Sequence, residues 1–199
     1  MCGITGIYST VSAPDEGVLR GMTDCLSHRG PDADGFFMEG PVGLGHRRLS
    51  ILDLHDAANQ PMTAANGRYV LVYNGEIYNF KAIAAELDQP FKTTGDTEIL
   101  LEAYARWGKD CLEKLNGMFA FAVYDKEAQS LFIARDRIGI KPLYYYYQEG
   151  QLFFASELKA LLTVPEVKAA LQINKEALNA YLHLGYIPQP HSIYENINK

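Results

Sequence analysis

The chain begins Met1-Cys2-Gly3-Ile4, and the rest of the sequence is best interpreted from this stretch. If the initiator Met is removed, Cys2 carries a thiol and a free α-amine on one carbon, so a single residue supplies a nucleophile and a base. The apolar residues 4–8 predict a strand, which would hold Cys2 at the beginning of a sheet element. A Cys at this position is also typical of an ordinary small apolar residue, so other residues must complete a site.

Composition limits the class of protein. With 199 residues, 48% of them hydrophobic and 21% charged, the chain can form one substantial core, or a large domain and the beginning of another. The net charge of -6 argues against a nucleic-acid partner. No signal peptide and no apolar run long enough to span a bilayer is found, so we expect a cytoplasmic protein with no membrane partner.

The periodicity of apolar residues and the turn residues predict the elements. Strands are expected over residues 4–8, 36–38, 42–47, 68–73, 118–125, 131–135, 143–147 and 152–155. Helices are expected over 14–26, 80–87, 156–161 and 175–184, with another that ends near Trp107 and is capped by Asp96 or Thr97. Strand runs that flank a pair of helices favour a layered α+β fold over a parallel doubly wound sheet.

The C-terminal part has a different character. We predict one domain over residues 2–162, followed by a linker and the start of a truncated C-terminal domain over residues 163–199. The last fourteen residues contain little that could cover a core, and residues 193–199 contain no pattern that predicts a closing element.

Three further positions suit chemistry at a Cys2 nucleophile. Asn74-Gly75 offers a side-chain amide and a closely approachable backbone N–H for a developing oxyanion, although a strand-ending turn is the alternative interpretation. Arg48 can grip a carboxylate with two donors, and Asp96 can hold an ammonium group. A surface ion pair is the alternative for each of these two charges.

Other polar residues predict no further site. The five histidines lack metal-ligand spacing, so no metal site is expected, and His46 is expected to be a packed strand residue. Cys25 and Cys111 lie in helix-like surroundings and are expected to be buried, reduced thiols.

A set of motifs resembles the glutaminase domain of glutamine-hydrolysing asparagine synthetases, which are class II glutamine amidotransferases. The resemblance covers roughly residues 2–162, in the family's order. The motifs are Met1-Cys2-Gly3-Ile4, Arg29-Gly30-Pro31-Asp32, His46-Arg47-Arg48-Leu49-Ser50-Ile51, Gln60-Pro61-Met62, Tyr73-Asn74-Gly75-Glu76-Ile77-Tyr78-Asn79, Gly117-Met118-Phe119-Ala120-Phe121 and the segment from Arg135 to Leu143.

This resemblance implies an N-terminal-nucleophile hydrolase fold, a four-layer αββα sandwich of two antiparallel sheets between helices. It implies that Cys2 attacks the glutamine amide through a γ-glutamyl thioester, with Asn74 and Gly75 as the oxyanion hole. The residues it assigns to glutamine binding are Arg48, Leu49, Ser50, Ile51, Leu52, Asn74, Gly75, Glu76 and Asp96.

The resemblance also implies partners. Ammonia would pass to a C-terminal synthetase domain in cis, which uses ATP and Mg²⁺ to make asparagine from aspartate and is absent from this chain. The glutaminase domain itself needs no cofactor, and the parent enzyme is a possible homodimer.

Other interpretations stay open from the sequence. The parent enzyme could use another acceptor. The chain could be a glutamine-binding module without turnover if Met1 is retained, or an interaction domain whose Cys2 is lipidated or buried.

Overall fold

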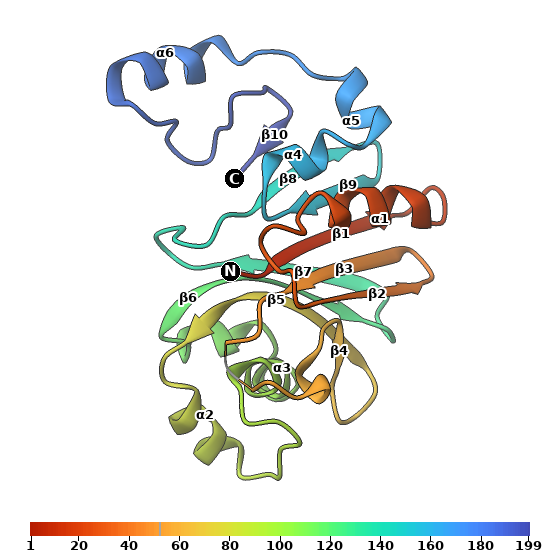
Figure 1. Ribbon diagram of the computed structural model, residues 1–199, viewed down its shortest axis with the longest axis vertical. Coiled ribbons are helices and arrows are strands. Elements are labelled where there is room, and N and C mark those ends of the chain that lie inside the picture. Colours follow the sequence, from red (N-terminus) through yellow and green to blue (C-terminus); the bar gives the residue numbers. More distant parts are fainter. Residues whose placement is uncertain (52) are drawn as a thin grey trace.

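The computed structural model describes residues 1–51 and 53–199, which form two antiparallel sheets enclosed by helices (Figure 1). The strands are β1 (Gly3–Ser9), β2 (Ala33–Glu39), β3 (Val42–Arg48), β4 (Met62–Thr63), β5 (Tyr69–Ile77), β6 (Gly117–Asp125), β7 (Ser130–Arg135), β8 (Tyr144–Gln148), β9 (Gln151–Ala155) and β10 (Ile197–Asn198). The helices are α1 (Glu16–Asp24), α2 (Phe80–Leu87), α3 (Asp96–Trp107), α4 (Leu158–Leu161), α5 (Pro165–Ala169) and α6 (Lys175–Leu184), with 3-10 turns at Asp56–Ala58 and Gly108–Glu113.

The layers stack as helices, sheet, sheet, helices. One sheet has the strand order β10-β8-β9-β1-β3-β2 and the other β4-β5-β6-β7. Helix α1 packs on β1 and β3 of the first sheet, and α3 packs on β5 of the second, so that each sheet has one helical face and one face toward its partner (Figure 1). The predicted αββα sandwich is confirmed.

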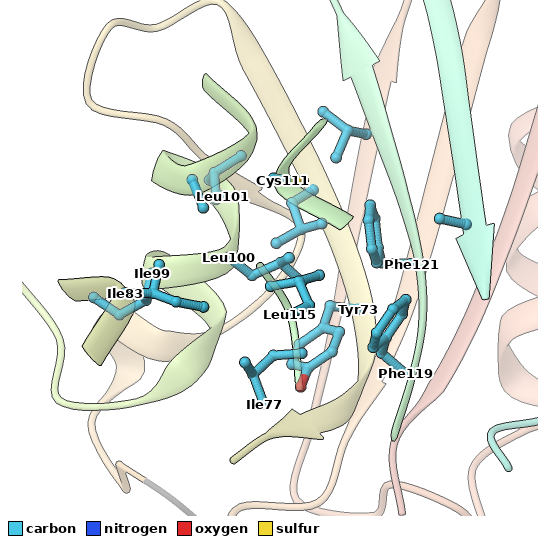
Figure 2. Close-up of a cluster of buried hydrophobic side chains, with 14 of the residues drawn as sticks. Tyr73, Ile77, Ile83, Ile99, Leu100, Leu101, Cys111, Leu115, Phe119 and Phe121 are labelled. Atoms are coloured by element: carbon cyan, nitrogen blue, oxygen red, sulfur yellow. The ribbon is translucent and has the colours of Figure 1, made fainter. Parts of the chain in front are cut away.

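Three apolar clusters hold these layers together. The cluster between the two sheets includes Ile4, Leu44 and Val72, all fully buried. The cluster between the second sheet and α2 and α3 is drawn in Figure 2, where Tyr73 lies beside Ile77 and Phe119. Successive side chains of a strand point to opposite faces of the sheet, so Val72 faces the other sheet and Tyr73 faces the helices.

Strand β1 lies between β3 and β9 in the middle of the first sheet. Gly3 pairs with Arg47, and Thr5 pairs with both Gly45 and Ala155. The predicted strand at residues 4–8 is confirmed, and it fixes Cys2 immediately before a strand bonded on both sides. A central strand cannot slip without moving its neighbours, so the position of Cys2 is set by the whole sheet.

Two predicted details are wrong. Helix α3 has Gly95 at its N-cap, not Asp96 or Thr97, because the Asp96 carboxylate is bonded elsewhere. The C-terminal residues also contain an element that the sequence did not predict: Ile197 pairs with Tyr146, which adds β10 to the edge of the first sheet. Two residues are too few to show strand alternation in a sequence.

Residues 163–199 therefore contact the sandwich in places. Val164, Val167 and Ile197 are buried in the cluster beneath α1 and α4. Helix α6, whose predicted bounds are confirmed, buries Ala177 and exposes most of its other side chains. The predicted division of the chain after residue 162 stays a prediction.

Two further expectations concern the burial of Cys25 and Cys111 and the absence of a membrane-spanning segment. Cys111 is buried, with a pKa raised to about 12 by burial, whereas Cys25 is only half-buried. Within residues 1–51 and 53–199, no helix combines the length and apolarity needed to cross a bilayer.

Candidate active site

Cys2 lines a pocket that lies between the beginning of β1, the end of β3, the later part of β5 and the N-terminus of α3. Its Sγ is 3.5 Å from the backbone nitrogen of Leu49 and 3.7 Å from the Leu49 carbonyl oxygen. Arg29 Nε donates to the Cys2 carbonyl oxygen at 2.9 Å, and Arg29 Nη1 donates to Glu157 at 2.8 Å. The backbone of the candidate nucleophile is thus held by a charged group that is itself anchored.

The pocket has a volume of about 240 Å³. Drug-sized ligands occupy pockets of roughly 300–1,000 Å³, so this one suits a smaller molecule. Its charged lining comprises two cations, Arg48 and Lys141, and two carboxylates, Glu76 and Asp96. Opposite charges in one small pocket are typical of a site for a zwitterion.

Asn74 and Gly75 lie in the middle of a strand pair. Strand β5 continues through both residues, which pair with Ala120 and Phe119 of β6, so the alternative of a strand-ending turn is wrong. Asn74 is 1% exposed, and its Nδ2 has no acceptor among the described residues. A buried amide donor without a partner is costly, which points to a ligand oxygen that completes it.

Gly75 permits a close approach of β6. A Cβ at this position would lie 2.5 Å from the Met118 carbonyl oxygen and 2.5 Å from the Tyr73 ring. The lack of a side chain is therefore needed here both for strand pairing and for the close packing of the Tyr73 ring.

Arg48 ends β3 and is 6% exposed. Its guanidinium donates to the carbonyl oxygens of Asp53 and His55 and, at 2.6 Å, to Asn59 Oδ1. Within the described part of the chain it forms no ion pair, so the surface ion-pair alternative is wrong. Three loop oxygens orient a buried cation along the pocket wall.

Asp96 faces the pocket from the first turn of α3. Its Oδ2 accepts from the Tyr73 hydroxyl at 2.7 Å and from the Ile77 backbone nitrogen at 2.8 Å. Burial raises the pKa of this carboxyl, and these hydrogen bonds oppose the rise. Glu76, by contrast, is exposed at the rim.

The segment after Arg48 is only partly at the pocket. Leu49 and Ile51 line it, and Ile51 is 72% exposed. Ser50 is not part of the lining, and its backbone nitrogen donates to Asp32 at 2.7 Å. Leu52, also predicted to contact the ligand, lies outside the described residues.

The predicted residues that line this pocket are Cys2, Arg48, Leu49, Ile51, Asn74, Gly75, Glu76 and Asp96. The structure adds others. Tyr73, Gln60 and Lys141 line the same pocket but were not predicted to act there. All three lie inside the quoted motifs, so the motif was the available signal. The sequence around these three residues has no spacing or charge pattern that places them at the pocket; their place follows from the pairing of the strands.

Across residues 1–51 and 53–199, no three His, Cys, Asp or Glu side chains lie close enough together to hold an ion. His46 is fully buried, and its Nε2 donates to the Tyr73 carbonyl oxygen at 3.2 Å.

Comparison with known proteins completes the description of the site. A family model for the glutamine amidotransferase domain matches residues 1–199. The chain belongs to this family. The amidotransferase domain thus includes Cys2, Asn74 and Arg48.

Curated relatives of the amidotransferase domain are much longer. It is 39% identical to a putative glutamine-hydrolysing asparagine synthetase 2 from Methanocaldococcus jannaschii, over 100% of this chain and 42% of the relative. It is 38% identical to asparagine synthetase 1 from Bacillus subtilis, over 100% of this chain and 32% of the relative. The resemblance to these synthetases is confirmed, and the chain spans less than half of either relative.

Solved structures confirm the N-terminal-nucleophile fold of the amidotransferase domain. A glutamine phosphoribosylpyrophosphate amidotransferase from Bacillus subtilis, complexed with ADP and GMP, superposes with a TM-score of 0.69 at 22% identity. The match covers 80% of this chain and 43% of the other. A second structure, titled as the allosteric regulatory enzyme of purine biosynthesis, gives a TM-score of 0.71 at 21% identity, over 81% of this chain and 43% of the other.

Proposed function

We propose that the domain hydrolyses the side-chain amide of glutamine to glutamate and ammonia, with Cys2 as the nucleophile. The observation that carries this proposal is the shared pocket of Cys2, Arg48, Asn74 and Asp96, in which Asn74 Nδ2 is buried without a hydrogen-bond partner among the described residues. Membership of the glutamine amidotransferase family supports the same reaction.

The chemistry begins once Met1 is removed. The freed amine of Cys2 takes the thiol proton, and Sγ attacks the amide carbon, which places negative charge on the amide oxygen. Asn74 Nδ2 and the Gly75 N–H stabilise that oxygen. The C–N bond then breaks as the protonated amine returns its proton to the departing nitrogen. Ammonia is released, and the γ-glutamyl group stays bound to Cys2 Sγ as a thioester. Water, deprotonated by the same amine, attacks the thioester and releases glutamate with the Cys2 thiol.

Recognition of glutamine uses its two charged groups. The α-carboxylate binds Arg48, whose loop contacts orient the guanidinium, and the α-ammonium binds Asp96, with Glu76 at the rim. Backbone groups of Leu49 and Ile51, which line the pocket, contribute further contacts. A mismatch in either charged group would weaken binding because the pocket wall carries fixed charges of both signs.

The parent protein is a separate part of the proposal. The synthetase relatives are two to four times longer than the matched region, which supports a C-terminal domain in cis that receives the ammonia. That domain would use ATP and Mg²⁺ to convert aspartate into asparagine, or would aminate another acceptor, in a possible homodimer. No described residue of this chain is assigned to ATP or Mg²⁺.

The reaction is tested by ammonia release from glutamine. Wild-type protein should release ammonia and glutamate in equal amounts, and Cys2→Ala should lower the rate by about 1,000-fold or more because the covalent route is lost. Cys25→Ala is the matched control and should keep the wild-type rate. Unchanged ammonia release by Cys2→Ala would refute the proposal.

A glutamine-binding module is the second candidate, because Met1 itself lines the pocket. Retained Met1 blocks the amine of Cys2 and removes the proposed base. The mass of the intact protein distinguishes the two candidates: processed protein that hydrolyses glutamine supports the enzyme, and unprocessed protein that binds glutamine without ammonia release supports the module.

A further inference from the structure

Tyr73 connects two parts of the pocket that lie on different elements. It is 2% exposed and faces the helical layer, where Figure 2 shows it beside Ile77 and Phe119. Its hydroxyl donates to Asp96 Oδ2 at 2.7 Å, and the Ile77 nitrogen donates to the same oxygen. Both of these bonds end on Oδ2, and in residues 1–51 and 53–199 no side chain or backbone group of another residue donates to Oδ1, so that oxygen can accept from a ligand.

The backbone of Tyr73 is held independently of its hydroxyl. Strand β4 pairs with Val70 and Leu71 only, so the edge of β5 at Tyr73 lacks a neighbouring strand. Side chains replace that strand: the Tyr73 nitrogen donates to Gln60 Oε1 at 2.6 Å, and His46 Nε2 lies 3.2 Å from the Tyr73 carbonyl oxygen. Both backbone groups are thereby satisfied at the residue before Asn74.

We propose that Tyr73 is a positioning residue whose hydroxyl aims the Asp96 carboxylate at the α-ammonium of glutamine, and so makes the site select substrates with an α-amine. This inference rests on the proposed function. Its geometry has two consequences. Loss of the hydroxyl should loosen Asp96, whereas Asn74 should stay in place because Gln60 and His46 still hold the backbone.

The charges around Asp96 give the proposal a pH signature. Glu76 from β5 raises the pKa of Asp96 further, and the Tyr73 hydrogen bond lowers it. The other charged or titratable side chains that line the pocket are the cations Arg48 and Lys141 and the thiol of Cys2. Without the Tyr73 hydroxyl the Asp96 pKa rises, so its carboxylate loses charge at a higher pH. Glutamine binding by a Tyr73→Phe variant should therefore weaken at a higher pH than in wild-type protein as the solution is acidified.

The test compares glutamine with 5-amino-5-oxopentanoate, the analogue that keeps the carboxylate and the amide but lacks the α-amine. For Tyr73→Phe we expect the glutamine KM to rise about tenfold, the typical scale for a lost hydrogen bond to a charged group, with kcat within about twofold. Inhibition by the analogue should stay within about twofold of wild type. Calorimetry of glutamine binding in the Cys2→Ala background gives the same comparison without turnover.

The matched control is Tyr69→Phe, four residues earlier on the same face of β5. The Tyr69 ring packs edge-on against Tyr104, with centroids 5.5 Å apart, and in the described chain its hydroxyl makes no hydrogen bond. This variant should keep the wild-type KM. Equal losses for glutamine and the analogue, or an unchanged glutamine affinity in Tyr73→Phe, would overturn the positioning role. Failure of the hydrolysis proposal is recognised separately, by ammonia release that persists in Cys2→Ala.

Discussion

His46 lies in the middle of β3 with none of its surface exposed. Its pKa is lowered to about 3, chiefly by burial; the hydrogen bond to the Tyr73 carbonyl opposes this shift, and the nearby Arg48 cation adds to it. The imidazole is thus neutral at physiological pH, with Nε2 as the donor to Tyr73. This agrees with its expected role as a packed strand residue, since a base with such a low pKa would remove no proton efficiently near pH 7.

The same residue gives a stability prediction. Unfolded His46 takes up a proton below about pH 6.5, whereas folded His46 stays neutral to about pH 3, so the unfolded state binds more protons and stability falls as pH falls. The contribution approaches about 1.4 kcal/mol per pH unit within that window. His46→Gln keeps a donor for Tyr73 but does not titrate. Its free energy of unfolding, measured with denaturant between pH 6.5 and 5, should fall less steeply than that of wild type; parallel slopes would contradict the assignment.

At the scale of elements, β1 depends on a glycine that brings a ring into contact with its backbone. A Cβ on Gly6 would lie 2.2 Å from the ring of Phe154, its partner in β9, and Phe154 is fully buried. Gly21 in α1 is the opposite case, because a Cβ there meets no atom within 4 Å. Close packing therefore requires a glycine at position 6, whereas position 21 has room for a side chain.

Alanine substitutions separate these two cases. Gly6→Ala should destabilise the domain by about 1–3 kcal/mol, because the ring must move in a packed core. Gly21→Ala should stabilise it by about 0.5–1 kcal/mol, since alanine favours the helix. Chemical denaturation of both variants checks the pair. A Gly6→Ala variant as stable as wild type would contradict the close packing of β1 on Phe154.

On the scale of the whole molecule, the C-terminal residues combine packed and exposed parts. Ile197 is 1% exposed and joins the cluster under α1 and α4, whereas Leu182 on α6 is 73% exposed. Other apolar side chains of α6 are exposed too, including Tyr181 and Leu184. The sandwich is therefore completed by a strand that follows a helix with little contact to it (Figure 1).

This arrangement predicts unequal effects of similar truncations. Ile197→Ala should cost about 2 kcal/mol or more, because it leaves a cavity in a buried cluster. Leu182→Ala should change stability by no more than about 0.5 kcal/mol. Thermal and denaturant unfolding of the two variants provide the measurement. Equal effects would show that β10 does not pack on the first sheet in solution.

Much of the fold was predictable because it rests on local patterns. The helical spacing from Phe80 to Leu87 buries Ile83 and Leu87 on one face, whereas the short strands β1 and β3 are buried on both faces. The β10 strand was not predictable, because its pairing with Tyr146 is a contact between distant residues. The cap of α3 was misjudged for a related reason: the Asp96 side chain is bonded to Tyr73 across the pocket instead of to its own helix.

The sequence by itself determined the candidate chemistry of the domain: a thiol beside the N-terminus, an amide donor next to a glycine, and separate cationic and anionic residues. Only the tertiary structure decided that Cys2, Arg48, Asn74 and Asp96 share one small pocket, and that Tyr73 holds one of them. The physical reason is that residue type fixes what a side chain can donate, accept or attack, whereas its partner, burial and pKa depend on strands brought together from distant parts of the chain.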